Sequence, residues 1–301
     1  MALTIMIWNT QHFDNQTQDE SEAYQQKKGF LLKYLQQVDI DIFTLFETGK
    51  TGNVNASLIN DLKSAYTAVA ILQQEGGKKK HSTLGSIVFV KNGLAKQYED
   101  ASETYILSDN EQRAPLLLKH KESGYCFAFY HANASYNASK NIVDTITFIQ
   151  DNLDNLELKG LLFFGGDLNV PVQSAYKEIK GLQLLAPTDP GYTHVSITNK
   201  TMEGVTSELN DQQTLGNYAN YKPKDYMQEY MFNQGIEEFV LQESLSLLDY
   251  AYVHSLSEWK AKCHGSIQKK ENQDYETIEI KRICCGMEIR SDHFPVLFTL
   301  V

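Results

Sequence analysis

At six places along this sequence a polar cluster follows an apolar run or lies within one. Each cluster contributes Asn, Asp, Glu or His. The six clusters are Trp8-Asn9-Thr10-Gln11, Phe46-Glu47-Thr48, His131-Ala132-Asn133, Gly166-Asp167-Leu168-Asn169, Leu248-Asp249-Tyr250 and Ser291-Asp292-His293. Burying a polar group without a partner is costly, so a single cluster at the end of a strand carries little information. Six of them predict a shared polar site at strand ends, of the kind that cleaves phosphate esters with the help of a metal ion.

The spacing of apolar residues predicts more strands than helices. Helices are expected at 21–37, 54–65 and 138–153, where apolar residues recur at helical intervals. Strands are expected at 3–8, 40–46, 66–72, 84–90, 116–119, 125–130, 161–164, 247–253, 277–283 and 294–300. Since helices fall between only some of the strands, the pattern favours sheets covered by helices over a strict parallel array.

The length of 301 residues is compatible with one α/β domain, which we expect to span 1–301. The segment 198–243 is polar, rich in Asn, Gln and Tyr, and weakly periodic. We interpret it as an insertion or a long loop with short helices, which is often functional when it borders a site.

The formal net charge of −11 does not favour nucleic-acid binding, because phosphate contacts require clustered Lys and Arg. It does not exclude such binding, since a local basic patch or a bound cation can supply the attraction. No signal peptide is visible, so a cytoplasmic location is expected, with secretion by another route left open. The four cysteines have no zinc-site spacing and are expected to be reduced thiols.

The ordered set WNxQ, a strand-ending Glu, HxN, GDLN, LDY and SDHFP resembles the endonuclease/exonuclease/phosphatase superfamily. Within it, the resemblance is strongest to the deoxyribonuclease I and cytolethal distending toxin B-subunit branch. Its local signs are Arg113-Ala114-Pro115, His131-Ala132-Asn133-Ala134, Ala186-Pro187-Thr188-Asp189-Pro190 followed by Thr193-His194, and Leu248-Asp249-Tyr250-Ala251. The resemblance implies a four-layered α/β sandwich, in which two packed mixed β-sheets are flanked by helices and carry the site at one edge. It also implies divalent-metal phosphodiesterase chemistry.

The sequence departs from that branch in three respects. The toxin subunits are secreted with a signal peptide, and none is visible in this sequence. The stretch between Thr193-His194 and Asp249 is long here. In deoxyribonuclease I the first histidine has a glutamate partner on an earlier strand, whereas the matching stretch 80–84 of this chain contains no carboxylate.

Three side chains are candidate metal ligands. A hard cation such as Mg²⁺ prefers oxygen donors, and Mn²⁺ is expected to substitute for it. Glu47 is the best candidate because it ends an apolar strand; Asn9 would add an amide oxygen and Asp292 a second carboxylate. The alternative for Glu47 alone is an ordinary surface carboxylate.

Five further residues are candidate catalytic groups: His131, Asp167, Asn169, Asp249 and His293. Asp167 and Asn169 alternate with Leu168, which predicts that both face the site, unless they merely form an Asx-turn. Asp249 is expected to orient His293, because a carboxylate on one imidazole nitrogen sets the tautomer of the ring. Which histidine acts as acid and which as base stays open.

Phosphate binding is expected from Arg113, Asn169 and His131, although an arginine before a strand is also compatible with simple solvation. Lys78-Lys79-Lys80-His81 could contact a nucleic-acid backbone or be merely solvated. Gln11 would support Asn9, and Thr193-His194 is either near the metal site or in a structural turn. Tyr218, Tyr221, Tyr226 and Tyr230 could stack on bases, but core packing of the insertion is the alternative.

Three functions remain compatible with this sequence. The leading hypothesis is a Mg²⁺-dependent endonuclease that cleaves DNA. The second is a phosphatase or phosphodiesterase acting on phosphoinositides or other small phosphate esters, which the acidic charge favours. The third is a catalytically silent binding protein on the same fold, which is disfavoured because the expected polar positions are filled except for the partner of His131.

Overall fold

The computed structural model describes residues 2–11, 13, 22–48, 52–72, 85–102, 113–134, 137–201, 206–207, 239–272 and 277–301. Two sheets make up the body of the protein. The first has the order β15-β19-β1-β2-β4-β3, with bounds β1 Leu3–Asn9, β2 Ile42–Phe46, β3 Tyr66–Leu72, β4 Ser86–Lys91, β15 Trp259–Cys263 and β19 Val296–Leu300. At its centre β1 is parallel to β2 and antiparallel to β19, so the sheet is mixed.

The second sheet is also mixed and has the order β5-β6-β7-β8-β14-β10-β9. Its strands are β5 Tyr98–Asp100, β6 Leu116–His120, β7 Tyr125–Phe129, β8 Gly160–Asp167, β9 Glu178–Ile179, β10 Leu182–Leu185 and β14 Asp249–His254. Here β7 is parallel to β8, while β14 is antiparallel to it. The predicted hairpin of 116–119 with 125–130 is therefore present as β6 and β7.

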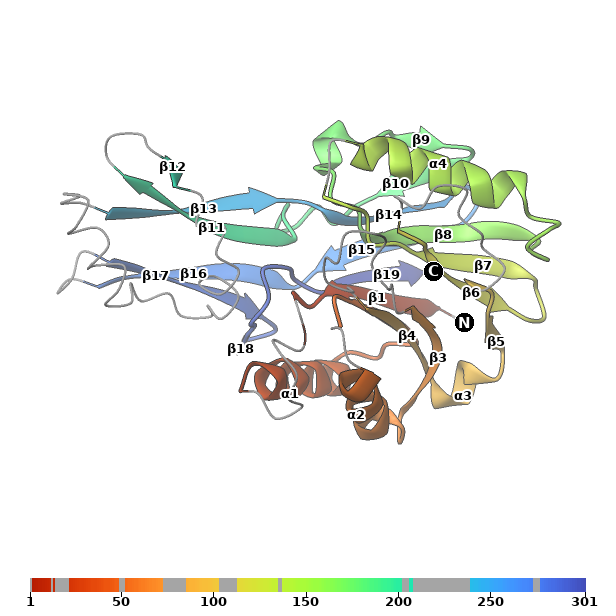
Figure 1. Cartoon of the computed structure of the whole chain (residues 1–301), viewed down its shortest axis with the longest axis horizontal. Coiled ribbons are helices and arrows are strands. Elements are labelled where there is room, and N and C mark those ends of the chain that lie inside the picture. The colour runs from red at the N-terminus through yellow and green to blue at the C-terminus, as the bar shows by residue number, and fades with distance from the viewer. Residues whose placement is uncertain are drawn as a thin grey trace.

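Helices cover the outer faces of both sheets (Figure 1). The first sheet is covered by α1 (Glu22–Gln37) and α2 (Gly52–Leu62), and the second by α4 (Ala138–Asp151). Two short elements, α3 (Asn92–Ala95) and a 3₁₀ turn (Val172–Ser174), complete the described helices. The four-layered α/β sandwich expected from the resemblance is confirmed.

Aromatic side chains fill the space between the two sheets. Phe163 of β8 packs on Trp259 of β15 and Phe298 of β19, with ring centroids 5.7 and 5.2 Å apart. On the far side of the second sheet, the apolar face of α4 buries Ile142, Ile146 and Ile149, as its periodicity predicted. This packing holds the strand ends of both sheets at a constant separation, which a site built across them requires.

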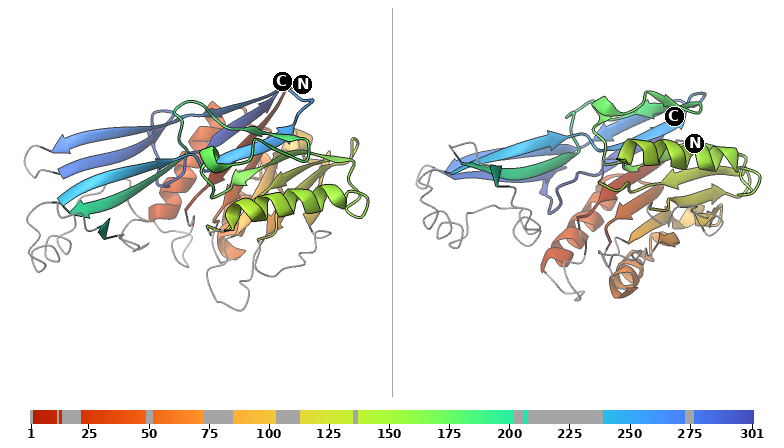
Figure 2. Two further views of the ribbon diagram at one scale, coloured as in Figure 1. Left: turned by 90° about the horizontal axis from the view of Figure 1, so that it is seen from above. Right: turned by 45° about the horizontal axis from the view of Figure 1, so that its top comes forward.

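Two three-stranded sheets extend from one end of the sandwich (Figures 1 and 2). One consists of β11 (His194–Thr201), β12 (Thr206–Ser207) and β13 (Phe239–Ser246); the other consists of β16 (Gly265–Asn272), β17 (Thr277–Cys284) and β18 (Met287–Glu288). The prediction of a long loop over 198–243 is wrong at both ends of that range, because β11 and β13 pair in continuous antiparallel register. Residues 208–238, with the four tyrosines named above, lie outside the described residues, as does the lysine cluster at 78–81.

No helix in the described ranges combines the length and the apolar character needed to cross a membrane.

Gly166 allows two strands to approach each other beside the site. A Cβ atom at this position would collide with the backbone carbonyl oxygen of Tyr130. We expect Gly166→Ala to lower the free energy of unfolding by about 1–3 kcal/mol or more, since the obstacle is backbone and cannot turn away. Urea unfolding measures the loss. Gly29→Ala is the matched control, because its Cβ would have no neighbour within 4 Å; equal stability of the two variants would contradict the prediction.

Candidate active site

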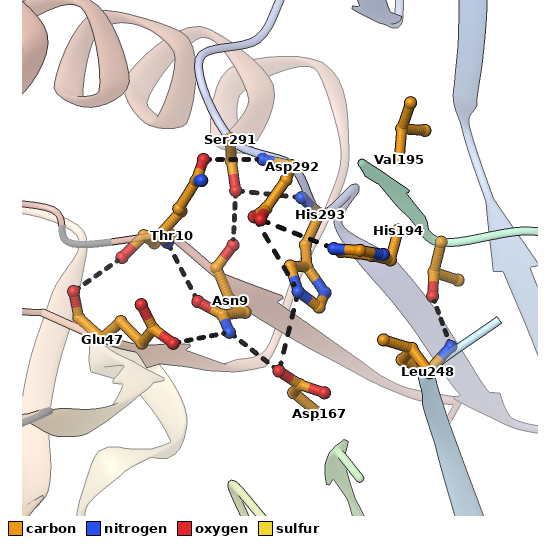
Figure 3. Close-up of polar contacts among 12 residues, drawn as sticks. Asn9, Thr10, Glu47, Asp167, His194, Val195, Leu248, Ser291, Asp292 and His293 are labelled. Atoms are coloured by element: carbon orange, nitrogen blue, oxygen red, sulfur yellow. Dashed lines mark hydrogen bonds and ion pairs between the residues drawn. The ribbon is translucent and has the colours of Figure 1, made fainter. Parts of the chain in front are cut away.

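The predicted polar clusters meet at one edge of the two sheets, and Figure 3 labels members of all of them except the cluster at His131. The register of the strands explains this convergence. Asn9 ends β1 and pairs with Phe46 at the end of the parallel strand β2, so Glu47 follows at the same edge. In the second sheet Asp167 ends β8 and lies opposite Asp249, which begins the antiparallel strand β14. Contacts between side chains of the two sheets then join both pairs into one site.

Asn9 makes the direct connection between the sheets. Its Nδ2 donates to Oε1 of Glu47 at 3.2 Å and to Oδ2 of Asp167 at 2.8 Å. Its Oδ1 accepts the backbone N–H of Gln11 at 2.9 Å. The Gln11 N–H thus binds the amide oxygen, and the NH₂ group faces the carboxylates. That Asn9 offers its oxygen to a metal ion stays a prediction.

Glu47 has an unusual backbone conformation, with φ at +57°. A left-handed conformation is unfavourable for a non-glycine residue and persists only where the surroundings impose it. The Thr10 hydroxyl and the Phe13 N–H both donate to the Glu47 carbonyl, at 3.2 and 2.8 Å. These bonds hold the turn that directs the carboxylate to Asn9, and such strain is frequent at functional sites.

His131 lies between two carboxylates. Its Nε2 is 3.5 Å from Oε1 of Glu47 and 3.5 Å from Oδ2 of Asp167. The ring is 6% exposed and packs near the ring of Phe46, with centroids 5.7 Å apart. The matching stretch for its expected partner, 80–84, lies outside the described residues, but Glu47 brings a carboxylate to this histidine.

His293 is held by the predicted partner. Its Nδ1 is 2.7 Å from Oδ2 of Asp249, a distance typical of a charge-assisted hydrogen bond. Its Nε2 faces Oδ2 of Asp167 at 3.7 Å and Oδ1 of Asp292 at 3.8 Å. Burial lowers the pKa of His293, but the carboxylates of Asp249, Asp167 and Asp292 raise it by more, so the net pKa is well above the ordinary value.

Asp167 and Asp292 are carboxyl groups of the site whose pKa values are shifted in opposite directions. Burial, opposed by His293 and reinforced by Asp249, raises the pKa of Asp167 to about 7. For Asp292, burial acts in the same direction, but His293, His194 and Arg282 outweigh it and hold the pKa of Asp292 well below its ordinary value. Two carboxylates of one site thus differ in the ease with which they take up a proton.

Arg113 and Asn169 meet at the carbonyl oxygen of Ala132. Arg113 Nη1 donates to it at 3.2 Å and Asn169 Nδ2 at 2.8 Å. Burial lowers the pKa of Arg113, and the nearby charges of Glu47 and Asp167 oppose this shift, which places the guanidinium beside the carboxylates.

The reason given for Asn169 from the sequence is wrong. Alternation along a strand cannot orient it, because β8 ends at Asp167 and Asn169 has φ at +51°. Its backbone N–H donates to Oδ1 of Asp167 at 3.1 Å, which is the Asx-turn considered as the alternative. The turn nevertheless leaves the Asn169 amide next to Arg113.

Four neighbours were missed or only weakly indicated by the sequence. Ser291 Oγ donates to the Asn9 carbonyl and accepts the His293 N–H, at 2.8 and 3.1 Å. Gln11 Oε1 accepts the Asp292 N–H at 3.0 Å, so it supports both Asn9 and Asp292. Thr193 Oγ1 accepts the N–H of Asp249 at 3.0 Å. His194 Nε2 lies 3.5 Å from Oδ2 of Asp292. Thr193 and His194 were indicated in the sequence only by the Thr193-His194 pair, which was expected near the metal site or in a structural turn.

The donor set fits a hard divalent cation. Glu47 and Asp292 supply carboxylate oxygens, which Mg²⁺ and Mn²⁺ prefer. Oδ1 of Asp292 is buried and has no hydrogen-bond partner among the described residues. A buried carboxylate oxygen without a donor is costly unless a cation satisfies it. Among the described residues, Asp292 belongs to a group of donor atoms that lie within 4.8 Å of one another, and Glu47 does not, so Glu47 as a ligand of the ion stays a prediction.

Comparisons with known proteins bear on the fold. No protein-family model and no curated protein matches the chain. Truncated TDP2 from Caenorhabditis elegans matches with a TM-score of 0.54 and 14% identity, over 99% of this chain and 97% of that one. D. rerio TDP2 complexed with single strand DNA product matches at 0.52 and 12%, over 100% and 99%. An endonuclease/exonuclease/phosphatase family protein from Bacteroides thetaiotaomicron matches at 0.50 and 16%, over 100% and 98%.

The chain has the deoxyribonuclease I-like fold. The matches extend over nearly the whole length of this chain and of all three solved structures. At 12–16% identity, the roles of individual residues rest on the geometry described above.

Proposed function

We propose that this protein is a divalent-metal-dependent phosphodiester hydrolase, and that it acts as an endonuclease on DNA. The observation that carries the proposal is the contact network across the two sheets, in which Asn9 joins Glu47 to Asp167 while Asp249 orients His293. The similarity to a TDP2 structure with a bound single strand DNA product supports DNA as the substrate. The local signs of the deoxyribonuclease I branch, Arg113 among them, favour internal cleavage.

In this proposal Asp167 takes the proton from the attacking water. A general base works best when its pKa lies near the operating pH, and the pKa of Asp167 is raised to about 7. The Asn9 amide holds Oδ2 of Asp167 by a hydrogen bond of 2.8 Å and so keeps the carboxylate in one orientation.

His293 and His131 act on the phosphate group. Because Asp249 accepts from Nδ1 of His293, Nε2 is the atom that reaches the reacting group. The raised pKa of His293 keeps this ring protonated, so it donates to a phosphate oxygen as negative charge develops there. His131 Nε2, between Glu47 and Asp167, is in position to bind a second oxygen.

Arg113 and Asn169 complete the phosphate site. A guanidinium can bind two phosphate oxygens at once, and an amide NH₂ adds a neutral donor. Both groups already meet at the Ala132 carbonyl, which holds them side by side before substrate arrives. A divalent cation bound by Glu47 and Asp292 would supply positive charge to the phosphate and stabilise the leaving oxygen.

Plasmid nicking tests the proposal directly. The purified chain should convert supercoiled DNA to the open circular form in Mg²⁺ or Mn²⁺ and should not do so in EDTA. Supercoiled plasmid left intact in both ions would refute the endonuclease. Degradation of a linear duplex by a preparation that leaves the closed circle intact would point to an exonuclease instead.

Glu47→Gln is expected to weaken the apparent affinity for Mg²⁺ by at least about tenfold, because it removes a charge from the ion while keeping the shape of the side chain. The measurement is the nicking rate as a function of Mg²⁺ concentration. Glu178→Gln is the matched control, since Glu178 is exposed on β9. An unchanged Mg²⁺ dependence in Glu47→Gln would remove this residue from the metal site.

A small phosphate ester is the second candidate substrate. The net charge of −11 favours it, because a long duplex is repelled by an acidic surface. Release of phosphate from an inositol phospholipid, by a preparation that leaves plasmid intact, would select this alternative.

A further inference from the structure

A second group of donor atoms shares Asp292 with the proposed magnesium ligands. It consists of His194 at the start of β11 together with Asp292 and His293 in the turn before β19 (Figure 3). His194 Nε2 is 3.5 Å from Oδ2 of Asp292, and His293 Nε2 is 3.8 Å from Oδ1 of the same carboxylate. One donor atom from each of the three residues lies within 4.8 Å of the others.

These separations suit a tetrahedral ion. With zinc-to-ligand distances of about 2.0–2.1 Å, neighbouring ligand atoms are about 3.3–3.4 Å apart. The two contacts of Asp292, at 3.5 and 3.8 Å, use different oxygens of that carboxylate, so the three ligand atoms would move inward from their separations of up to 4.8 Å when an ion binds. The backbone already holds the three residues together. His194 and His293 form an isolated β-bridge, and the Val195 N–H donates to the Asp292 carbonyl at 2.7 Å.

Hydrogen bonds within the described residues leave room for a ligand at this group. Oδ1 of Asp292 has no hydrogen-bond partner there, and no partner on Nδ1 of His194 holds that ring in another direction. Asp249 accepts from Nδ1 of His293, an arrangement that orients the ring and makes Nε2 a better ligand. The side chains of His194 and Asp292 are 17% and 21% exposed, so an ion and its remaining water ligand have access.

The local charge also favours a cation. The carboxylates of Asp167, Asp249 and Asp292 surround His293. The opposing group is the buried guanidinium of Arg282, whose Nη2 donates to the Val195 carbonyl at 2.8 Å. A divalent ion would take the place of the proton on Nε2 of His293, so that the three carboxylates attract the ion while Arg282 opposes it.

We propose that His194, Asp292 and His293 form a binding site for a transition-metal dication, Zn²⁺ in particular, that inhibits the enzyme. Two imidazoles and one carboxylate suit Zn²⁺ rather than Mg²⁺, which prefers oxygen. Zinc at this site occupies Nε2 of His293 and one oxygen of Asp292, so neither is available for hydrolysis. The binding of zinc does not depend on the proposed function, whereas its inhibitory effect rests on that function.

Binding is tested first, by titrating the full chain with Zn²⁺ and, for its absorption spectrum, with Co²⁺. We expect one site with nitrogen and oxygen ligands, and we expect His194→Gln to weaken its affinity at least about tenfold. His264→Gln is the matched control, because Nδ1 of His264 lies 3.3 Å from Sγ of Cys285 and offers a competing thiol-containing site. Absence of binding, equal binding by His194→Gln, or a thiolate absorption band lost in His264→Gln would overturn the proposal.

Inhibition is tested by plasmid nicking in saturating Mg²⁺ with increasing Zn²⁺, each variant being compared with its own zinc-free rate. The zinc concentration that halves the rate should rise at least about tenfold in His194→Gln and stay constant in His264→Gln. Zinc that binds through His194 without slowing cleavage would overturn the inhibitory role. Zinc binding through His194 in a protein that cleaves no plasmid would refute the proposed endonuclease and support the metal site.

Discussion

Replacing His293 with alanine is expected to lower kcat for DNA cleavage about a hundredfold to ten thousandfold, the range typical of a lost acid–base group. The reason is geometric. Nδ1 of His293 is engaged by Asp249 at 2.7 Å, and Nε2 faces Asp167 and Asp292, so the ring is oriented toward the reacting phosphate. Alanine leaves nothing in that position to donate to the phosphate oxygen.

The measurement is single-turnover cleavage of a defined DNA substrate in saturating Mg²⁺. His254→Ala is the matched control, because His254 ends β14 at the opposite end of the strand from Asp249. Thermal unfolding of both variants checks that the fold persists. A cleavage rate of His293→Ala within about threefold of the rate of the unchanged protein would exclude His293 from the chemistry. The interpretation as a catalytically silent binding protein would then have to be considered again.

Asp167→Asn is expected to produce a loss of similar size and to change the pH dependence of the reaction. Asp167 accepts a proton only as the carboxylate, and burial raises its pKa to about 7. Below that pH the group is increasingly protonated, so kcat/KM should fall about tenfold for each pH unit of acidification. Above it kcat/KM should reach a plateau. Asparagine keeps the shape of the side chain but cannot accept the proton.

The pH profile separates this role from a structural one. In Asp167→Asn the residual kcat/KM should no longer fall as the pH is lowered from about 7 to about 5.5. A variant that is merely destabilised would keep this fall. Asp144→Asn, on the outward part of α4, is the control. A flat profile in the unchanged protein from pH 8 to 5.5 would contradict the assignment of Asp167 as the base.

The order of polar clusters was readable from the sequence because each lies at a strand end. Apolar runs identify strands locally, and the polar residue at the end of a run is then placed at a sheet edge. In this way Asn9, Glu47, Asp167 and Asp249 were predicted to meet, and the structure brings them together. The helical face of α4 was equally local, since its three isoleucines recur at helical spacing.

Strands made of polar residues were not readable. The 198–243 range has no strong alternation, so β11 and β13 were expected to be loop, yet they pair over eight residues. The tendency of such a segment to form a strand depends on the partner beside it more than on its own residues. In the second sheet that extends from the sandwich, the strand predicted at 277–283 is present as β17, but its polar partner β16 was not foreseen for the same reason.

The sequence by itself determined which residue types are available for chemistry and at which strand ends they lie, because both follow from local periodicity. Only the tertiary structure decided how those side chains face one another. It turned the Asn9 oxygen to Gln11, set His131 between Glu47 and Asp167, and brought His194 to Asp292 across 98 positions of sequence. Such contacts depend on the packing of two sheets and on which donors are already engaged, and neither is encoded in any short stretch of chain.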